Sequence, residues 1–317
     1  MRKSRSNKRS LQVKGRHMPK LRHLALYTAD PKATAEFYKR VFDMQEVGQN
    51  RSAFADEIIF LSDGTLMVAL LHFKTPETAA KMGGSMELGL NHFGFWVEDL
   101  EETRRRLREV ESENTYTNDP TANTLFVEEK WKGPDGVAFD INDKGWPGAL
   151  SPGEEEARGE GPKIRHLAFH TANVEKAADF YKRVFDMLEV GRNTTATSEG
   201  IYLSDGTLNV TILQATVPLS EFAKYSGSTA LGMSHFGFLV QDVEEIQRRL
   251  RDVGAVHIDE QLAGLVHAED KWRGPDGVLF DVTDQGWTGA RPLGETEMKP
   301  GAHRNNRQYG DAKLAER

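Results

Sequence analysis

Hydrophobic and polar residues alternate in short stretches along this chain, and these stretches predict strands and helices in a recurring order. Residues 21–28 alternate and are rich in β-compatible side chains, which predicts a strand with His23, Ala25 and Tyr27 on one face. Apolar residues then recur at helical spacing over 33–42, which predicts an amphipathic helix. The first strand therefore carries a histidine on a defined face.

The helix has a start signal in Asp30-Pro31, where an N-cap residue is followed by a first-turn proline. Three extended stretches come after the helix, over residues 45–50, 57–61 and 66–73. The Ser62-Asp63-Gly64 turn signal joins the last two stretches as a hairpin. The predicted unit is therefore βαβββ.

The same order starts again after a glycine-rich connection over 81–89. The hydrophobic pattern predicts a strand over 92–97 and a helix over 99–110. Two further strands, over 125–129 and 137–142, are expected on either side of a Gly-Pro-Asp-Gly turn. The first half of the chain therefore contains two similar strand–helix–strand modules.

Residue identity shows that the whole pattern occurs twice. The octet 37–44, Phe-Tyr-Lys-Arg-Val-Phe-Asp-Met, returns unchanged at 180–187, and the His-Phe-Gly-Phe run at 92–95 returns at 235–238. The period is far longer than the about 20 to 50 residues of a solenoid repeat. Each half is therefore expected to fold as a domain, and the chain is a tandem duplication.

Residues between the two repeats are rich in Gly, Pro and Glu and lack apolar periodicity, which indicates a linker. The first 17 residues contain seven Lys or Arg and no acidic residue. We therefore divide the chain into a disordered basic arm over 1–19, a first domain over 20–147, a linker over 148–162, a second domain over 163–290 and a flexible tail over 291–317.

Composition narrows the chemistry that the domains could perform. The 317 residues include no cysteine, which excludes disulfides, thiolate nucleophiles and cysteine-bound zinc or iron–sulfur clusters. The formal net charge of -7 gives no reason to expect nucleic-acid binding, and no apolar run reaches the roughly 18 residues of a membrane helix. We expect a cytoplasmic protein with a small-molecule substrate, and a homo-oligomer stays open.

Six residues are both suitable metal ligands and present in both repeats. Two histidines and one carboxylate can occupy one face of an octahedral ion and leave the other positions free, which suits Fe(II) and also Mn(II) or Zn(II). The candidates come from three separate predicted strands of each half, so only the fold can bring them together. They are His23, His92 and Asp140 in the first half, and His166, His235 and Asp281 in the second.

The repeated βαβββ order, the first-strand histidine, the His-Phe-Gly-Phe strand and the Pro-Asp-Gly turn before a carboxylate resemble the vicinal oxygen chelate superfamily. That superfamily includes glyoxalases, bleomycin resistance proteins and extradiol dioxygenases. The resemblance implies an α+β fold in which two βαβββ modules form an eight-stranded cupped sheet in each domain. It also implies that the six candidates occupy the family's ligand positions, with Asp where the family usually has Glu.

The resemblance also identifies departures from the family pattern. Glyoxalases use a fourth ligand on the last strand of the first module, where only His72 and Gln214 could serve here. The extradiol pattern expects Tyr where this chain has Lys130 and Lys271, which could orient an anionic or phenolic substrate or act as a base.

Two other pairs of equivalent residues lie near the predicted sites. Tyr27 and His170, beyond the first ligands on their strands, are candidates to hydrogen-bond a bound substrate. Trp146 and Trp287 close the last strands and are interpreted as packing residues.

These observations favour a non-haem Fe(II) dioxygenase of the extradiol type, acting on a small aromatic or vicinal-oxygen substrate. A glyoxalase- or epimerase-like lyase or isomerase, in which Mn(II), Zn(II) or Ni(II) stabilises an enediolate, is the second hypothesis. A non-catalytic drug-binding resistance protein is the third. Since both halves keep all three ligands, we expect two metal sites in each chain.

Overall fold

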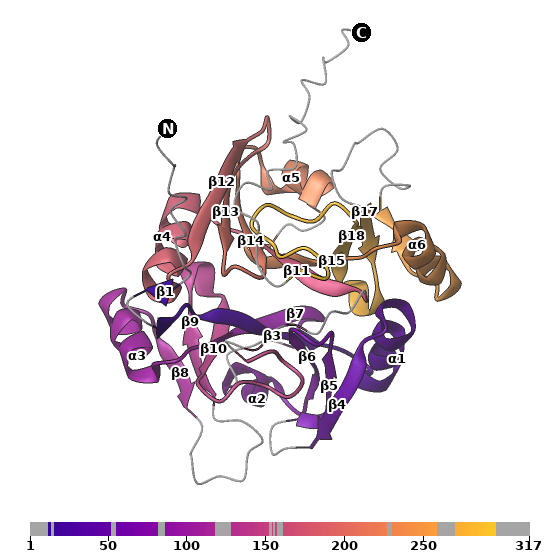
Figure 1. Cartoon of the computed structure of the whole chain (residues 1–317), viewed down its shortest axis with the longest axis horizontal. Coiled ribbons are helices and arrows are strands. Elements are labelled where there is room, and N and C mark those ends of the chain that lie inside the picture. The colour runs from indigo at the N-terminus through magenta and orange to yellow at the C-terminus, as the bar shows by residue number, and fades with distance from the viewer. Residues whose placement is uncertain are drawn as a thin grey trace, which may run out of the picture.

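The computed structural model describes residues 12–13, 16–51, 55–81, 86–117, 128–151, 154, 156, 161–226, 230–258 and 270–295. These residues form two domains, each built on one eight-stranded mixed sheet (Figure 1). Two short antiparallel strands, β1 (Gln12–Val13) and β2 (Arg16–His17), precede the first domain.

The first domain contains a strand-rich module on each side of residue 85. In chain order its elements are β3 (Lys20–Tyr27), α1 (Pro31–Phe42), β4 (Gln45–Asn50), β5 (Ala55–Ser62), β6 (Met67–Phe73), α2 (Pro76–Lys81), β7 (Gly89–Trp96), α3 (Leu100–Glu109), β8 (Asn114–Thr117), β9 (Glu129–Lys132), the 3-10 turn Pro134–Gly136 and β10 (Ala138–Asn142).

The second domain repeats this series. Its elements are β11 (Lys163–His170), α4 (Val174–Phe185), β12 (Leu188–Thr194), β13 (Ser198–Ser204), β14 (Asn209–Ala215), α5 (Leu219–Ser226), β15 (Gly232–Leu239), α6 (Val243–Asp252), β16 (Val256–His257), β17 (Asp270–Arg273), the 3-10 turn Pro275–Gly277 and β18 (Leu279–Thr283).

Strand order confirms the predicted architecture of two βαβββ modules in each domain. The first sheet runs β4-β5-β6-β3-β7-β10-β9-β8, and the second runs β12-β13-β14-β11-β15-β18-β17-β16. The opening strands of the two modules, β3 and β7, pair antiparallel at the centre, whereas β10 runs parallel to β7. The fold is α+β, with the first strands of both modules in the middle of the sheet.

Helix α1 begins at its predicted start signal and ends at Phe42. The Asp30 carboxylate accepts hydrogen bonds from the backbone N–H groups of Lys32 and Ala33, which would otherwise have no partner at a helix start. Asp43 then adopts the left-handed conformation with φ of 55° and ends the helix. The apolar face, which includes Phe37 and Val41, is buried.

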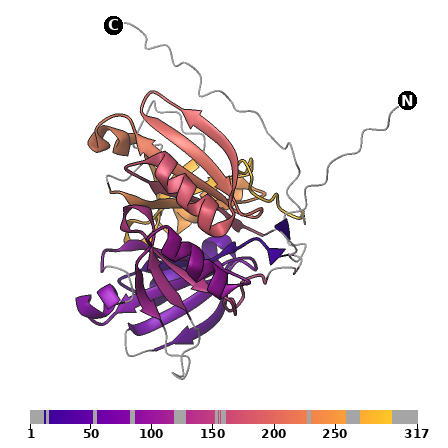
Figure 2. The ribbon, with the colours of Figure 1, turned by 90° about the vertical axis from the view of Figure 1, so that its left-hand side faces the viewer.

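The main hydrophobic core lies between the two sheets and includes residues of both domains. Phe42 of α1 stacks on Phe238 of β15 with ring centroids 3.7 Å apart, and Phe95 of β7 stacks on Phe185 of α4 at 3.8 Å. Helix α1 contacts α6 on one side of the molecule and α3 contacts α4 on the other (Figures 1 and 2). The two domains therefore share one core.

The repeated Ser-Asp-Gly hairpins also join the domains. Asp63 accepts hydrogen bonds from the backbone of Thr65 in its own turn and from the backbone N–H of Ile164, in β11 of the second domain. Asp205 does the same for Thr207 and for Leu21, in β3 of the first domain. Each hairpin therefore holds the opening strand of the other domain.

The remaining face of each sheet points away from the other domain, and the outer strands bend around it (Figure 1). We call these faces the first cup and the second cup. In the first cup a separate hydrophobic cluster includes Ala25 and Tyr27 of β3, Met67 and Leu71 of β6, and Trp146. The alternation on β3 therefore places His23 in the cup while Leu24 and Leu26 enter the shared core.

Three details of the predicted elements need correction. The strand expected over 125–129 is instead β9, at Glu129–Lys132, and residues 118–127 lie outside the described part. Strand β8 and the short helices α2 and α5 were not predicted. The end of the basic arm is ordered, since Met18 is 3% exposed and the His17 backbone N–H donates to Glu98. The rest of the arm's prediction lies mostly outside the described residues, as does the tail after 295.

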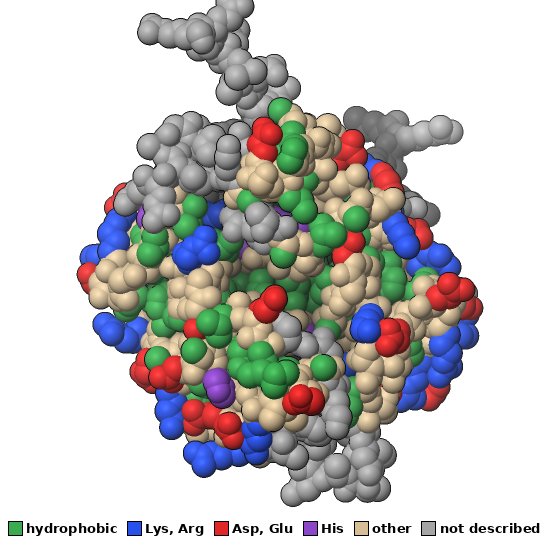
Figure 3. Space-filling view, turned by 180° about the vertical axis from the view of Figure 1, so that it is seen from behind, with side chains coloured by type: hydrophobic (Ala, Val, Ile, Leu, Met, Phe, Trp, Pro, Cys, Tyr) green, Lys and Arg blue, Asp and Glu red, His purple; other side chains and the backbone are tan. Residues whose placement is uncertain are grey.

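Charged side chains cover the flanks of the molecule. In Figure 3 basic and acidic side chains alternate along both sides. Several belong to helical ion pairs, such as Arg105 with Glu102 and Glu109, and Arg248 with Glu245. No helix in the described part of the chain is both long and apolar enough to cross a membrane.

Candidate metal centre

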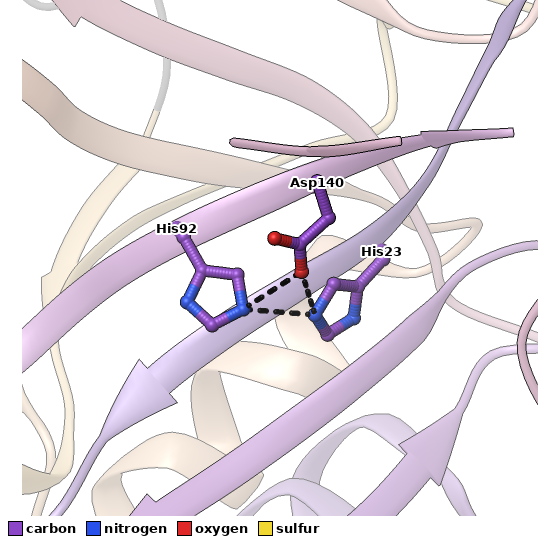
Figure 4. A group of neighbouring side chains, drawn as sticks. All are labelled: His23, His92 and Asp140. Carbon is purple, nitrogen blue, oxygen red and sulfur yellow. Dashed lines mark hydrogen bonds and ion pairs between the residues drawn. The ribbon is translucent and has the colours of Figure 1, made fainter. Parts of the chain in front are cut away.

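Three neighbouring strands bring the candidate ligands of the first cup together. His23 lies on β3 opposite Gly94 of β7, and Gly94 lies opposite Asp140 of β10. His92 is two residues before Gly94, so its side chain enters the same cup. Figure 4 shows the two imidazoles and the carboxylate pointing toward one another.

The donor atoms converge closely. His23 Nε2 lies 3.3 Å from His92 Nε2, and Asp140 Oδ2 lies 3.2 Å from His92 Nε2 and 3.8 Å from His23 Nε2. Ligand atoms about 2.1 Å from one ion at right angles would be about 3 Å apart. The spacing therefore matches that of ligands around a single metal ion.

The second cup repeats the arrangement on β11, β15 and β18. His166 and Asp281 both lie opposite Gly237, and His235 precedes it by two residues. The two Nε2 atoms are 3.4 Å apart, and His235 Nε2 is 3.1 Å from Asp281 Oδ2. In each cup the three ligand atoms lie within 4.8 Å of one another, and all three side chains are buried.

A tryptophan supports the first histidine of each cup. Trp146 stacks on His23 with centroids 5.2 Å apart, and Trp287 stacks on His166 at 4.9 Å. A Cβ atom on Gly94 would lie 2.8 Å from the Trp146 ring, and one on Gly237 would lie 2.5 Å from the Trp287 ring. The glycine of the His-Phe-Gly-Phe motif is therefore needed so that the indole can lie against the imidazole.

Hydrogen bonds at Nδ1 orient several of the imidazoles. His166 Nδ1 is 2.8 Å from Asn209 Oδ1, and His92 Nδ1 is 2.9 Å from Asn91 Oδ1. Since an amide oxygen only accepts, these contacts place the proton on Nδ1 and leave the Nε2 lone pair toward the other ligands. This is the tautomer that a metal ligand requires.

Burial keeps the imidazoles neutral. Desolvation, followed by the neighbouring imidazole, lowers the pKa of both His23 and His166 to about 3. Desolvation also lowers the pKa of His92 and His235. Burial alone would raise the pKa of Asp281, but the charge on Lys271 outweighs burial, so this pKa is lowered. Neutral imidazoles beside an ionised carboxylate are suitable metal ligands.

A buried lysine also contacts each carboxylate. Lys130 of β9 lies directly opposite Asp140 in the sheet, and its Nζ is 2.6 and 2.8 Å from the two carboxylate oxygens and 3.2 Å from His92 Nε2. Lys271 lies opposite Asp281 and donates to Oδ1. The ammonium neutralises a carboxylate that would otherwise be buried without a counter-charge.

The donor set therefore fits a divalent ion in both cups. Two neutral Nε2 atoms and one carboxylate oxygen are borderline ligands suited to Fe(II), Mn(II) or Zn(II), and they occupy one side of the site. The lysine ammonium already contacts the aspartate of each cup. A bound metal ion would therefore share this carboxylate with the ammonium. Which metal each cup prefers stays a prediction.

The other predicted site residues divide into two groups. His170 lies in the second cup, and Tyr27 at the end of the first cup stacks on Phe73. His72 instead contacts the Thr28 carbonyl through Nδ1, and Gln214 accepts a hydrogen bond from the Val174 backbone. Because these two alternate with the cup-facing residues of β6 and β14, neither reaches the ligand group.

Sequence reasoning missed the position of the tryptophans, which it interpreted as packing residues. Their signal was present, because Trp146 and Gly94 recur together as Trp287 and Gly237. Glu128 was also missed: it accepts a hydrogen bond from Trp146 Nε1 at 2.6 Å. Burial and the nearby Asp140 raise the pKa of Glu128. Nothing in its sequence position separates it from an ordinary surface glutamate.

A family profile matches both halves of the chain. The profile described as Glyoxalase/Bleomycin resistance protein/Dioxygenase superfamily matches residues 20–141 and 163–282. Together these segments cover well over half of the chain. No curated protein sequence matches the chain.

Several solved structures share the fold. A triple mutant of 4-hydroxymandelate synthase from Streptomyces coelicolor has a TM-score of 0.64 and 16% identity, over 86% of this chain and 95% of that chain. The Mn(II)-bound glyoxalase from Novosphingobium aromaticivorans has a TM-score of 0.59 and 14% identity, over 90% of this chain and 87% of that chain. The 2,3-dioxygenase LapB from Pseudomonas sp. KL28 has a TM-score of 0.57 and 16% identity, over 86% of this chain and 96% of that chain. At these identities the likeness concerns the fold alone.

Proposed function

Since the chain belongs to the Glyoxalase/Bleomycin resistance protein/Dioxygenase superfamily, we propose that it is a metal-dependent enzyme with one divalent ion in each cup. The reaction we propose is an Fe(II)-dependent dioxygenation of a small aromatic or vicinal-oxygen substrate. His23, His92 and Asp140 would hold the ion in the first cup. The equivalent residues His166, His235 and Asp281 would hold it in the second.

The observation that carries this proposal is a ligand set of two imidazoles and one carboxylate in each cup. His72 and Gln214, the two candidates for a fourth ligand, are directed away from the site. Three protein ligands leave positions for a bidentate substrate and for oxygen, as non-haem Fe(II) oxygenases require. Similarity of fold to a 2,3-dioxygenase is consistent with this class but does not select the substrate.

An Fe(II) ion held there would supply a Lewis acid and one-electron redox chemistry. The chain's own residues would supply orientation and a dry site. Trp146 keeps the His23 ring in place by stacking, and the three side chains that would hold the ion are buried. Lys130 Nζ, next to the ligand group, offers a fixed positive charge to an anionic oxygen of a substrate.

A glyoxalase-like lyase or isomerase is the second candidate. The observation in its favour is the same lysine, because an amine 3.2 Å from His92 Nε2 is close enough to the ligand group to exchange a proton with a bound substrate. This reaction would proceed with a redox-inactive ion and would consume no oxygen. Metal identity and oxygen dependence therefore separate the two candidates.

The test is anaerobic reconstitution with Fe(II), followed by oxygen uptake with catechols and 2-oxo acids as probes. We expect oxygen uptake with at least one probe, and its loss in the matched variant His23→Ala/His166→Ala. Turnover with Zn(II) or Mn(II) but without oxygen would favour the lyase. Absence of specific metal binding would contradict both candidates and leave the third, a drug-binding protein.

A further inference from the structure

The duplication allows the linings of the two cups to be compared position by position. His23 lies beside Met67, and His166 lies beside Asn209 at the equivalent place. Every second residue from there faces the cup, because the intervening residues enter the shared core. On β6 the cup-facing residues are Met67, Ala69, Leu71 and Phe73, and on β14 they are Asn209, Thr211, Leu213 and Ala215.

The neighbouring strands differ in the same direction. Strand β5 turns Ile58 and Phe60 into the first cup, where β13 places Gly200 and Tyr202 in the second. At the end of the opening strands Tyr27 is replaced by His170. The first cup is therefore lined by larger and mostly apolar side chains, and the second by smaller or more polar ones.

The two cups also differ in the solvent exposure of the side chains that line them. In the first cup Phe60, Leu71 and Phe73 are buried, at 4%, 6% and 3% exposure. Their counterparts Tyr202, Leu213 and Ala215 are half-buried. Tyr27 also stacks on Phe73, which fills the end of the first cup with aromatic rings. The second cup leaves more of its wall available to a ligand.

Polar groups near the second ligand set form a connected row. Thr211 Oγ1 donates to Asn209 Oδ1 at 2.8 Å, and Asn209 Oδ1 also contacts His166 Nδ1. The threonine hydroxyl keeps its acceptor lone pairs, so it can receive a hydrogen bond from a ligand. Met67 and Ala69 offer no such group in the first cup.

His170 adds an independent sign of a ligand. It is 2% exposed, its Nδ1 lies 3.3 Å from the Ala230 carbonyl, and its Nε2 has no hydrogen-bond partner among the described residues. With the proton on Nδ1, Nε2 is an acceptor in a buried place. A buried polar atom without a partner is unfavourable, so a donor on a bound molecule would satisfy it.

Resting on the proposed function, we infer that the two cups bind different members of the vicinal-oxygen class. The first cup takes a ligand whose substituent is apolar, which packs on Met67, Leu71 and Phe60. The second takes a smaller ligand with an additional hydrogen-bond donor, which reaches His170 Nε2 or Thr211 Oγ1. The duplication has therefore produced one enzyme with two specificities.

The experiment uses two variants of the full chain that each retain one ligand set. His166→Ala/His235→Ala leaves the first cup, and His23→Ala/His92→Ala leaves the second. Each is loaded with Mn(II) and titrated anaerobically, by calorimetry, with 4-butylcatechol and with pyrogallol. We expect the first cup to favour 4-butylcatechol and the second to favour pyrogallol, with Kd ratios that differ by at least about 10-fold, the scale on which pockets discriminate such groups.

Reciprocal lining variants provide the matched control. Thr211→Ala/Ala215→Phe should move the preference of the second cup toward that of the first, and Ala69→Thr/Phe73→Ala should do the opposite. If both cups bind both probes with the same Kd ratio, this inference is wrong and the proposed function is unaffected. If the protein binds metal but neither probe, the proposed substrate class is wrong and this inference falls with it.

Discussion

At the scale of single residues, the buried lysine beside each aspartate determines how the charge of the candidate metal site is balanced. Lys130 and Asp140 are 1% and 0% exposed, so their charges are out of water. The ammonium balances the carboxylate when no ion is bound. An ion that binds Asp140 would take over this role, so the lysine and the metal are linked through one anion.

We predict that Lys130→Met lowers the free energy of unfolding of the metal-free protein by about 3–5 kcal/mol, because it leaves a buried carboxylate without a counter-charge. Saturating Mn(II) should remove most of this loss, since the ion replaces the missing positive charge. Urea unfolding with and without Mn(II) measures both effects. The control is Lys132→Met, which breaks an exposed pair with Glu113 and should cost below about 1 kcal/mol. A loss that Mn(II) does not reduce would contradict the link.

His170 gives a prediction on pH. Burial, followed by repulsion from the nearby His235 ring if that ring is protonated, lowers the pKa of His170 to about 4, whereas the unfolded chain has about 6.5. Between these values only the unfolded chain binds the proton, so stability falls as the pH falls from about 6.5 to about 4. His170→Phe should make this decline shallower by about 1.4 kcal/mol per pH unit in the metal-free protein. Urea unfolding at several pH values measures this decline, and the control Tyr27→Phe should leave it unchanged. If His170→Phe also leaves the decline unchanged, the interpretation is wrong.

The convergence of two histidines and one aspartate in each cup could be predicted from the sequence because duplication doubled the signal. A single His23 would be indistinguishable from a structural histidine, but His166 recurs in the same context. The contact of Lys130 with Asp140 could not be predicted, because it depends on which residues of β9 and β10 are paired. Register between strands is set by the whole sheet rather than by local sequence.

At the scale of elements, the centre depends on the row His23, Gly94, Asp140 across β3, β7 and β10. Because the middle strand has no side chain there, the Trp146 ring occupies the space and stacks on His23. The glycine thus leaves room for the indole beside the three side chains that these strands position.

We expect Gly94→Ala to destabilise the protein by about 1–3 kcal/mol, because the new Cβ would overlap Trp146. It should also weaken metal binding in the first cup while leaving the second unchanged. Urea unfolding and metal titration measure the two effects. Gly161→Ala, where a Cβ would meet nothing within 4 Å, is the control and should change stability by less than about 0.5 kcal/mol. Equal effects of the two substitutions would refute the role of Gly94.

Most elements could be predicted from periodicity, and the failures have physical causes. Strand β9 has the sequence Glu-Lys-Trp-Lys, which reads as polar, yet Glu129, Lys130 and Trp131 are all buried. Glu129 pairs with Arg104 of α3, and Lys130 pairs with Asp140. Hydrophobic patterns do not detect a strand whose buried polar groups are satisfied by partners far away in the sequence.

At the scale of the whole molecule, the two domains share one hydrophobic core. Phe42 and Phe95 stack on residues of the second domain, and Asp63 and Asp205 hold strands across the boundary. The two Pro-Asp-Gly turns do the same, because Asp135 accepts from Thr171 and Asp276 accepts from Thr28. The duplication was visible in the sequence, but these contacts were not, because each pairs residues of different repeats.

We therefore predict a single cooperative unfolding transition in calorimetry. Phe42→Ala should shift that transition as a whole, with a loss of about 3–5 kcal/mol, because it removes a buried ring from the shared core. Lys39, one turn earlier and partly exposed, provides the control substitution Lys39→Ala. Two separate transitions, or a shift confined to one of two, would contradict the shared core.

The most direct test of the account is the number of divalent ions that the chain binds. Metal-free protein would be titrated with Mn(II) and the bound metal measured after removal of free ion. We predict two ions for the wild-type chain, one for His23→Ala/His92→Ala, one for His166→Ala/His235→Ala and none when all four are replaced. A wild-type chain that binds no ion, or a stoichiometry that these substitutions leave unchanged, would contradict the account.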